Sequence, residues 1–190
     1  MNTGRTVAVQ KRFGRETLDV REFIRPTSYM VAEVSDRLWR RTRSIQMFVQ
    51  KAYAFILTEV RTPTGNLVTR DWHQLNAFHD EGSARPLVTE QANDFWAFPS
   101  ETLTQRIGDC DDKCILLTSM LRRYIGANRV FCTVGALNGV GHMWVTVDGR
   151  VLETTAERPP VQEGPPYDPM FRFNDNHTVV LRALTDLPLA

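Results

Sequence analysis

Residues 108 to 114 read GDCDDKC, and this short stretch stands at the start of a long apolar run. Three aspartates surround Cys110, although negative neighbours oppose the formation of a thiolate. Acidic side chains are favoured in the first turn of a helix, where they stabilise the positive end of the dipole and can accept hydrogen bonds from its free N–H groups. The stretch therefore predicts a helix that starts at Asp109 and carries Cys110 in its first turn.

The apolar run continues to Tyr124 and stops near Gly126. A helix that is apolar on most of its faces belongs inside a domain. A thiol at the N-terminus of such a helix has its pKa lowered by the helix dipole, and lowered further by a neighbouring imidazolium. Cys110 is thus a candidate nucleophile. Cys114 and Cys132 lie on apolar faces, and we interpret them as structural.

Three β-type runs follow, separated by Asn138-Gly139 and Asp148-Gly149; they are residues 129–137, 141–147 and 150–154. Both dipeptides favour two-residue hairpin turns. In the resulting register His142 and Glu153 are diagonal neighbours, with Cα atoms about 7 to 8 Å apart. Since side chains alternate along a strand, the same face is expected to carry Trp144, Thr146, Val151 and Thr155. An acid held against a histidine fixes its tautomer and stabilises its charged form, which is half of a catalytic constellation.

The remaining sequence predicts a single domain over 1–190, because 190 residues that are 42% hydrophobic suffice for one buried core.

Apolar residues that recur every three or four positions in 29–60 predict two helices with a break near Arg43-Ser44. Ser100 is expected to cap a short helix that ends before Gly108. We divide the chain into an N-terminal arm at 1–28, a helical region at 29–60, a long loop at 61–94, a catalytic core at 95–155, and a C-terminal loop and strand at 156–190.

Composition argues against several classes of partner. Lys plus Arg number 23 and Asp plus Glu 22, so the formal charge of +1 gives no reason to expect nucleic acid or an anionic membrane. The arginine-rich stretch 37–43 is interpreted as a solvated helix face. No apolar stretch approaches the length of a membrane span, and the N-terminal residues 1–16 lack the apolar region of a secretory signal. The three cysteines form no CxxC pair. These features predict a reducing, cytoplasmic location.

The Cys, His and acid blocks together resemble those of the transglutaminase-like superfamily, and with Asp94-Phe95-Trp96 ahead of them they are most similar to bacterial transglutaminase-like cysteine proteinases. The blocks are residues 100–103, 108–112, 141–145 and 151–154, and the likeness covers about 45–155. It implies an α+β, papain-like core in which the nucleophile helix packs on an antiparallel β-sheet. It also implies a triad of Cys110 as nucleophile, His142 as general base and then acid, and Glu153 as the orienting acid.

Glu153 departs from this family, which usually has aspartate at the corresponding place. Glutamate is longer by one methylene, so the role requires either a wider strand spacing or a side chain that folds back.

The resemblance implies thiol-dependent acyl transfer, with hydrolysis of a peptide or amide bond in a protein or peptide substrate as the leading interpretation. Transfer to an amine, as in a protein-glutamine transglutaminase, uses the same triad and is the first alternative. The second is a non-catalytic interaction module that keeps the core and binds a partner through 61–92 and 159–169. The oxyanion would be held by the Cys110 N–H and a second donor, for which Trp96 is the candidate.

No cofactor is expected, but two metal sites stay open as alternatives. Some bacterial relatives bind calcium through acids that flank the nucleophile, and Asp109, Asp111 and Asp112 occupy the matching places. Helix capping is the competing interpretation of these aspartates. A zinc site would combine Cys110 and Cys114 with His73 and His79, although this spacing is not typical of zinc.

Overall fold

The computed structural model describes residues 8–10, 17–62, 96–155 and 161–181. Among these residues, two α-helices precede the undescribed range 63–95 and two follow it, with a short 3-10 helix before the first of them. Their bounds are η1 (Val20–Phe23), α1 (Tyr29–Trp39), α2 (Ile45–Glu59), α4 (Pro99–Gln105) and α5 (Cys110–Arg122). Most of the expected loop at 61–94 lies outside the described residues, as do His73 and His79 of the zinc alternative.

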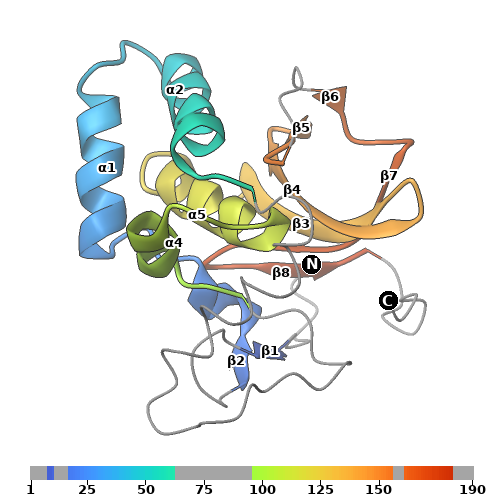
Figure 1. Cartoon of the computed structure of the whole chain (residues 1–190). Coiled ribbons are helices and arrows are strands. Elements are labelled where there is room, and N and C mark those ends of the chain that lie inside the picture. Colours follow the sequence, from blue (N-terminus) through green and yellow to red (C-terminus); the bar gives the residue numbers. More distant parts are fainter. Residues whose placement is uncertain (1–7, 11–16, 63–95, 156–160, 182–190) are drawn as a thin grey trace, which may run out of the picture.

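Six strands form one antiparallel sheet in the order β6-β5-β4-β3-β7-β8 (Figure 1). They are β3 (Val130–Leu137), β4 (Val140–Val147), β5 (Arg150–Leu152), β6 (Val161–Gln162), β7 (Tyr167–Phe173) and β8 (Thr178–Val180). A separate ribbon pairs β1 (Ala8–Gln10) with β2 (Thr17–Asp19). The predicted meander is confirmed, because β3, β4 and β5 are consecutive neighbours joined by the two expected turns.

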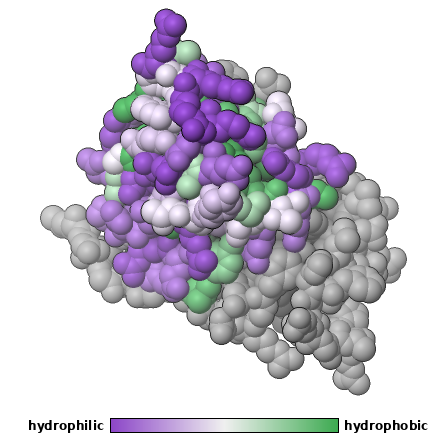
Figure 2. Space-filling model, turned by 90° about the vertical axis from the view of Figure 1, so that its left-hand side faces the viewer, coloured by the Kyte–Doolittle hydropathy of each residue, from purple (hydrophilic) through white to green (hydrophobic). Residues whose placement is uncertain are grey.

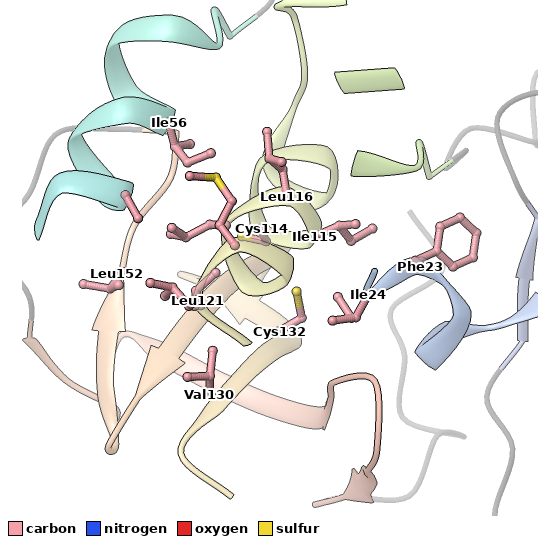
Figure 3. Close-up of a cluster of buried hydrophobic side chains, with 14 of the residues drawn as sticks. Phe23, Ile24, Ile56, Cys114, Ile115, Leu116, Leu121, Val130, Cys132 and Leu152 are labelled. Carbon is pink, nitrogen blue, oxygen red and sulfur yellow. The ribbon is translucent and has the colours of Figure 1, made fainter. Parts of the chain in front are cut away.

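Helix α5 lies between the sheet and the other helices, as Figure 1 shows. Its residues from Asp111 to Leu121 are all buried, which explains why its sequence is apolar on most faces. Figure 3 shows Ile115, Leu116 and Leu121 of α5 in one cluster of buried side chains with Val130 and Leu152 from the sheet. The core thus fixes α5 against β3, β4 and β5.

The break expected near Arg43-Ser44 is present between α1 and α2. Ser44 caps α2, with its hydroxyl accepting a hydrogen bond from the Met47 N–H. Ser100 does not cap α4, so that prediction was wrong. The helix begins at Pro99, which is favoured at a first helical position, and the Glu101 carboxylate accepts from the N–H of Phe98 at 2.6 Å.

The C-terminal region contains more sheet than the sequence suggested. Residues 159–169 were expected to be loop, but β6 and the start of β7 lie there. Strand β7 accommodates Pro169 where its register against β3 shifts between Val134 and Gly135, and an irregularity of this kind is where a sheet tolerates proline. The expected last strand is present as β8.

The face that carries α1 and α2 is largely hydrophilic (Figure 2). The arginines at 37, 40, 41 and 43 are exposed there, as expected of a solvated surface. Among the described helices, none is both long enough and apolar enough to cross a membrane.

Candidate active site

His142 and Glu153 are in direct contact, as the hairpin register predicted. The Nε2 atom of His142 lies 2.9 Å and 3.1 Å from the two carboxylate oxygens of Glu153. Both side chains are largely buried, with 12% of the imidazole and 3% of the carboxylate side chain exposed. Because Nε2 is bonded to Glu153, Nδ1 is the nitrogen through which the ring can serve another group.

The extra methylene of Glu153 is accommodated by folding the side chain back along its own segment. Its Oε1 atom accepts hydrogen bonds from the backbone N–H of Thr155 at 3.1 Å and from the Thr155 hydroxyl at 2.8 Å. The Tyr167 hydroxyl lies 3.4 Å from Oε2. Burial opposes the charged form of Glu153, but the hydrogen bonds from His142 and Thr155 outweigh it and lower the pKa of this carboxyl group to about 2.

The two hairpin strands separate where these residues lie. Pairing between β4 and β5 ends at Val145 and Leu152. Two positions further on, the Cys114 thiol of α5 donates to the Met143 carbonyl at 3.3 Å and lies 3.3 Å from the Thr154 hydroxyl. The start of α5 therefore fills the gap between the two separated strands.

A buried lysine strengthens the junction between the start of α5 and the segment that follows β5. The Nζ atom of Lys113 donates to the Thr154 carbonyl at 3.3 Å and to the Thr62 hydroxyl at 2.6 Å. The Tyr53 hydroxyl donates to the Glu153 carbonyl at 2.6 Å from α2. The segment that carries the acid is therefore tied to two helices, and burial lowers the pKa of Lys113.

The three cysteines occupy different environments. Cys110 is the first residue of α5 and is half-buried, whereas Cys114 and Cys132 are fully buried in the core. Burial raises the pKa of the Cys114 thiol well above its usual range and that of Cys132 to about 12. The latter two thiols are therefore held in the unreactive form, in agreement with the structural role predicted for them.

The aspartates beside Cys110 lie at the start of α5 as expected, with Asp111 and Asp112 in its first turn. Asp109 occupies the N-cap position but its side chain makes no capping hydrogen bond. Asp111 and Asp112 are buried rather than directed into solvent, and Asp112 accepts from the N–H of Ala97 ahead of α4. One carboxylate oxygen from each aspartate lies within 4.8 Å of the others. The three carboxylates could together hold a metal ion, and hard oxygen ligands of this kind suit calcium.

Trp96 is part of the core. Its ring stacks on Phe173 with centroids 5.4 Å apart and meets Phe23 edge-on at 5.5 Å. Its Nε1 atom is buried and makes no hydrogen bond within the described part of the chain. The contacts with Phe23 and Phe173 explain why a large aromatic residue occupies position 96. The assignment of Trp96 as an oxyanion donor stays a prediction.

Sequence reasoning did not identify Lys113, Tyr53 or Tyr167 as neighbours of the site. Lys113 carried one signal, since a charged residue inside an apolar helix requires a polar partner. Tyr53 and Tyr167 carried none, because their contacts with Glu153 join residues 100 and 14 positions apart.

The chain matches no family model and no curated protein. It does match solved structures of LapG from Legionella pneumophila. One is 16% identical, with a TM-score of 0.57 over 80% of this chain and 76% of that chain. EGTA-treated LapG is 16% identical, with a TM-score of 0.57 over 83% and 77%. Calcium-bound LapG is 17% identical, with a TM-score of 0.45 over 82% and 91%. The likeness to the first two structures shows the fold, and the expected α+β architecture, with the Cys110 helix packed on an antiparallel sheet, is confirmed.

Proposed function

We propose that this domain is a cysteine hydrolase that cleaves a peptide or amide bond through Cys110, His142 and Glu153. The observation that carries the proposal is the buried His142–Glu153 pair beside the gap that the start of α5 fills. A histidine held by an ionised acid through Nε2 keeps Nδ1 available to take a proton from a thiol.

The contacts between α5 and the sheet support the placement of the thiol. Cys114 meets the Met143 carbonyl, and one turn later Thr118 lies 3.1 Å from Cys132, whose strand partner is Val145. Four residues of helix advance about 6 Å and two residues of strand about 6.8 Å. Helix α5 and strand β4 therefore advance in the same direction and in step.

Extending this spacing by one turn back along α5 would put Cys110 level with Gly141 and beside His142. The ring of His142 lies on the face of β4 that carries Trp144, at 6.3 Å between ring centroids, whereas Met143 and Val145 belong to the core cluster around α5. Cys110 would therefore reach Nδ1 around the edge of β4, at the place where β5 has turned away.

The chemistry follows from these positions. The N-terminus of α5 and the imidazolium favour the Cys110 thiolate, which attacks the carbonyl carbon of the substrate. The Cys110 N–H holds the oxyanion, with Trp96 as the predicted second donor. His142 returns its proton to the leaving amine, and the thioester is then hydrolysed by water that His142 activates. Transfer of the acyl group to an amine would use the same residues and remains the alternative reaction.

We assign Asp109, Asp111 and Asp112 as the residues that would hold a calcium ion. The ion would neutralise the buried carboxylates next to the nucleophile and fix the start of α5. The three side chains belong to α5 and its N-cap, so the ion would act through the position of this turn.

Alkylation with iodoacetamide tests the catalytic assignment. Cys110 should be modified at least about tenfold faster than Cys114 or Cys132 at neutral pH, because the latter two thiols are buried and protonated. His142→Ala should slow modification of Cys110 about tenfold, and Cys110→Ala should abolish peptide hydrolysis. Labelling of the unfolded protein, in which all three thiols are equivalent, is the control. Slow and equal labelling of the three thiols in the folded protein would refute the assignment.

A further inference from the structure

Within the described part of the chain, one edge of β4 is open beside the proposed site. Strand β4 pairs with β3 along its whole length, from Val140 to Val147, but β5 pairs only with its last three residues, 145–147. Met143 is the next residue whose backbone carbonyl points out from that edge. This carbonyl accepts a hydrogen bond from the Cys114 thiol and is not paired with a strand. Beyond it, Gly141 has no strand partner on this side among the described residues.

The hairpin geometry fixes where the backbone of Gly141 points. The two-residue turn at 138–139 makes Leu137 and Val140 a hydrogen-bonded pair, so the next pair, Ala136 and Gly141, exchanges no ladder hydrogen bonds. The N–H and C=O of Gly141 therefore point away from β3, as the carbonyl of Met143 does. Gly141 offers one donor and one acceptor on the open edge.

The fold itself does not require glycine at this position. Gly141 is exposed, does not have a positive φ angle, and a Cβ atom there would meet nothing within 4 Å. Gly135 is different, because a Cβ atom there would lie 2.2 Å from the Asp168 carbonyl. Alternation along β4 directs a side chain at 141 to the same face as Met143, which is the α5 side. Among the described residues, the missing side chain thus leaves open space, which the extrapolated spacing of α5 would put at the level of Cys110.

We propose that the edge at Gly141 binds the substrate as an extended peptide, whose backbone adds as a short strand next to β4. The inference deepens the proposed function and rests on it: the substrate class is a polypeptide segment in β conformation, and not a small isolated amide. Such a strand would pair its backbone with the N–H and C=O of Gly141 and pass over the open space to reach Cys110.

Two alkylating reagents with the same reactive group test this inference. Acetyl-Ala-Ala-Ala chloromethyl ketone carries a peptide backbone with minimal side chains, whereas chloroacetone carries none. In both cases the Cys110 thiolate displaces chloride and forms a thioether, which peptide mass spectrometry quantifies. After normalisation to their rates with free N-acetylcysteine, the peptide reagent should modify Cys110 about tenfold faster, as two additional backbone hydrogen bonds would allow.

Substitutions on the strand separate the edge from the nucleophile. Gly141→Val should abolish the tenfold preference by blocking the approach, and Gly141→Pro should do so by removing the donor, so that the normalised rates of the two reagents become equal. Val140→Phe is the matched control, because Val140 is 69% exposed and its side chain lies on the opposite face. It should retain the preference.

The two proposals fail in different ways. If Cys110 is modified selectively but both reagents act equally fast, or if Gly141→Val keeps the preference, the edge proposal is overturned and the catalytic assignment stands. If neither reagent selects Cys110 over Cys114 and Cys132, the catalytic assignment is overturned, and the edge proposal with it.

Discussion

At the scale of single residues, Glu153 is the most constrained group of the site. It accepts hydrogen bonds from the His142 ring and from the N–H and hydroxyl of Thr155, so its charged form is stabilised although only 3% of it is exposed. Its pKa falls from 4.5 to about 2. A carboxyl group with a lowered pKa stabilises the folded state above its unfolded pKa, and this contribution is lost as the pH falls toward its folded pKa.

We therefore expect the wild-type protein to lose stability between about pH 4.5 and pH 2 more steeply than the Glu153→Gln variant. The difference should be about 1 to 2 kcal/mol after allowance for solvent screening. Urea denaturation over a series of pH values measures it, and Glu33→Gln on the exposed side of α1 supplies the control substitution. Parallel stability curves of wild type and Glu153→Gln across this window would show that the carboxylate is not held as described.

At the scale of elements, the decisive contact is the insertion of the start of α5 between β4 and β5. Lys113 holds this contact, since its ammonium group joins Thr154 beyond β5 to Thr62 beyond α2. Lys113→Met should destabilise the protein by about 1 to 3 kcal/mol, because the buried Thr154 carbonyl loses its donor and the nearby carboxylates lose a counter-charge.

Lys51→Met is the matched control for Lys113→Met. Lys51 also donates to a backbone carbonyl, that of Arg41 at 2.7 Å, but it does so at the surface. Its loss should change the free energy of unfolding by less than about 0.5 kcal/mol. Equal effects of the two substitutions in urea denaturation would mean that Lys113 does not hold the junction.

At the scale of the whole molecule, the calcium site proposed at Asp109, Asp111 and Asp112 would link the stability of the domain to a cation. An ion that binds only the folded state stabilises it by about 2.7 kcal/mol at a concentration a hundredfold above its dissociation constant. For a domain of this size, that corresponds to a rise in melting temperature of about 5 to 10 °C. We expect calcium to raise the melting temperature of EGTA-treated protein by such an amount.

Asp109→Asn should remove this calcium-dependent rise, whereas Asp148→Asn should keep it. Asp148 is paired with Arg129 on the exposed turn between β4 and β5, far along the chain from the cluster. Differential scanning fluorimetry with and without calcium provides the comparison. A melting temperature that does not respond to calcium would remove the assignment of the three aspartates as ligands.

The sequence by itself determined the features that depend on neighbours along the chain. Turn dipeptides fixed the register that brings His142 to Glu153, and apolar spacing identified the buried helix behind Cys110. These predictions succeeded because a two-residue turn and a helical repeat are set by local backbone geometry.

Only the tertiary structure decided how the start of α5 fits against the sheet. The contacts that do so join residues far apart in sequence: Lys113 to Thr62, Asp112 to Ala97, and Cys114 to Met143. The same holds for β7, which lies beside β3 although a proline-rich segment leads into it. Whether an aspartate caps a helix or is buried depends on which segment packs against it, and a local pattern carries no information about that partner.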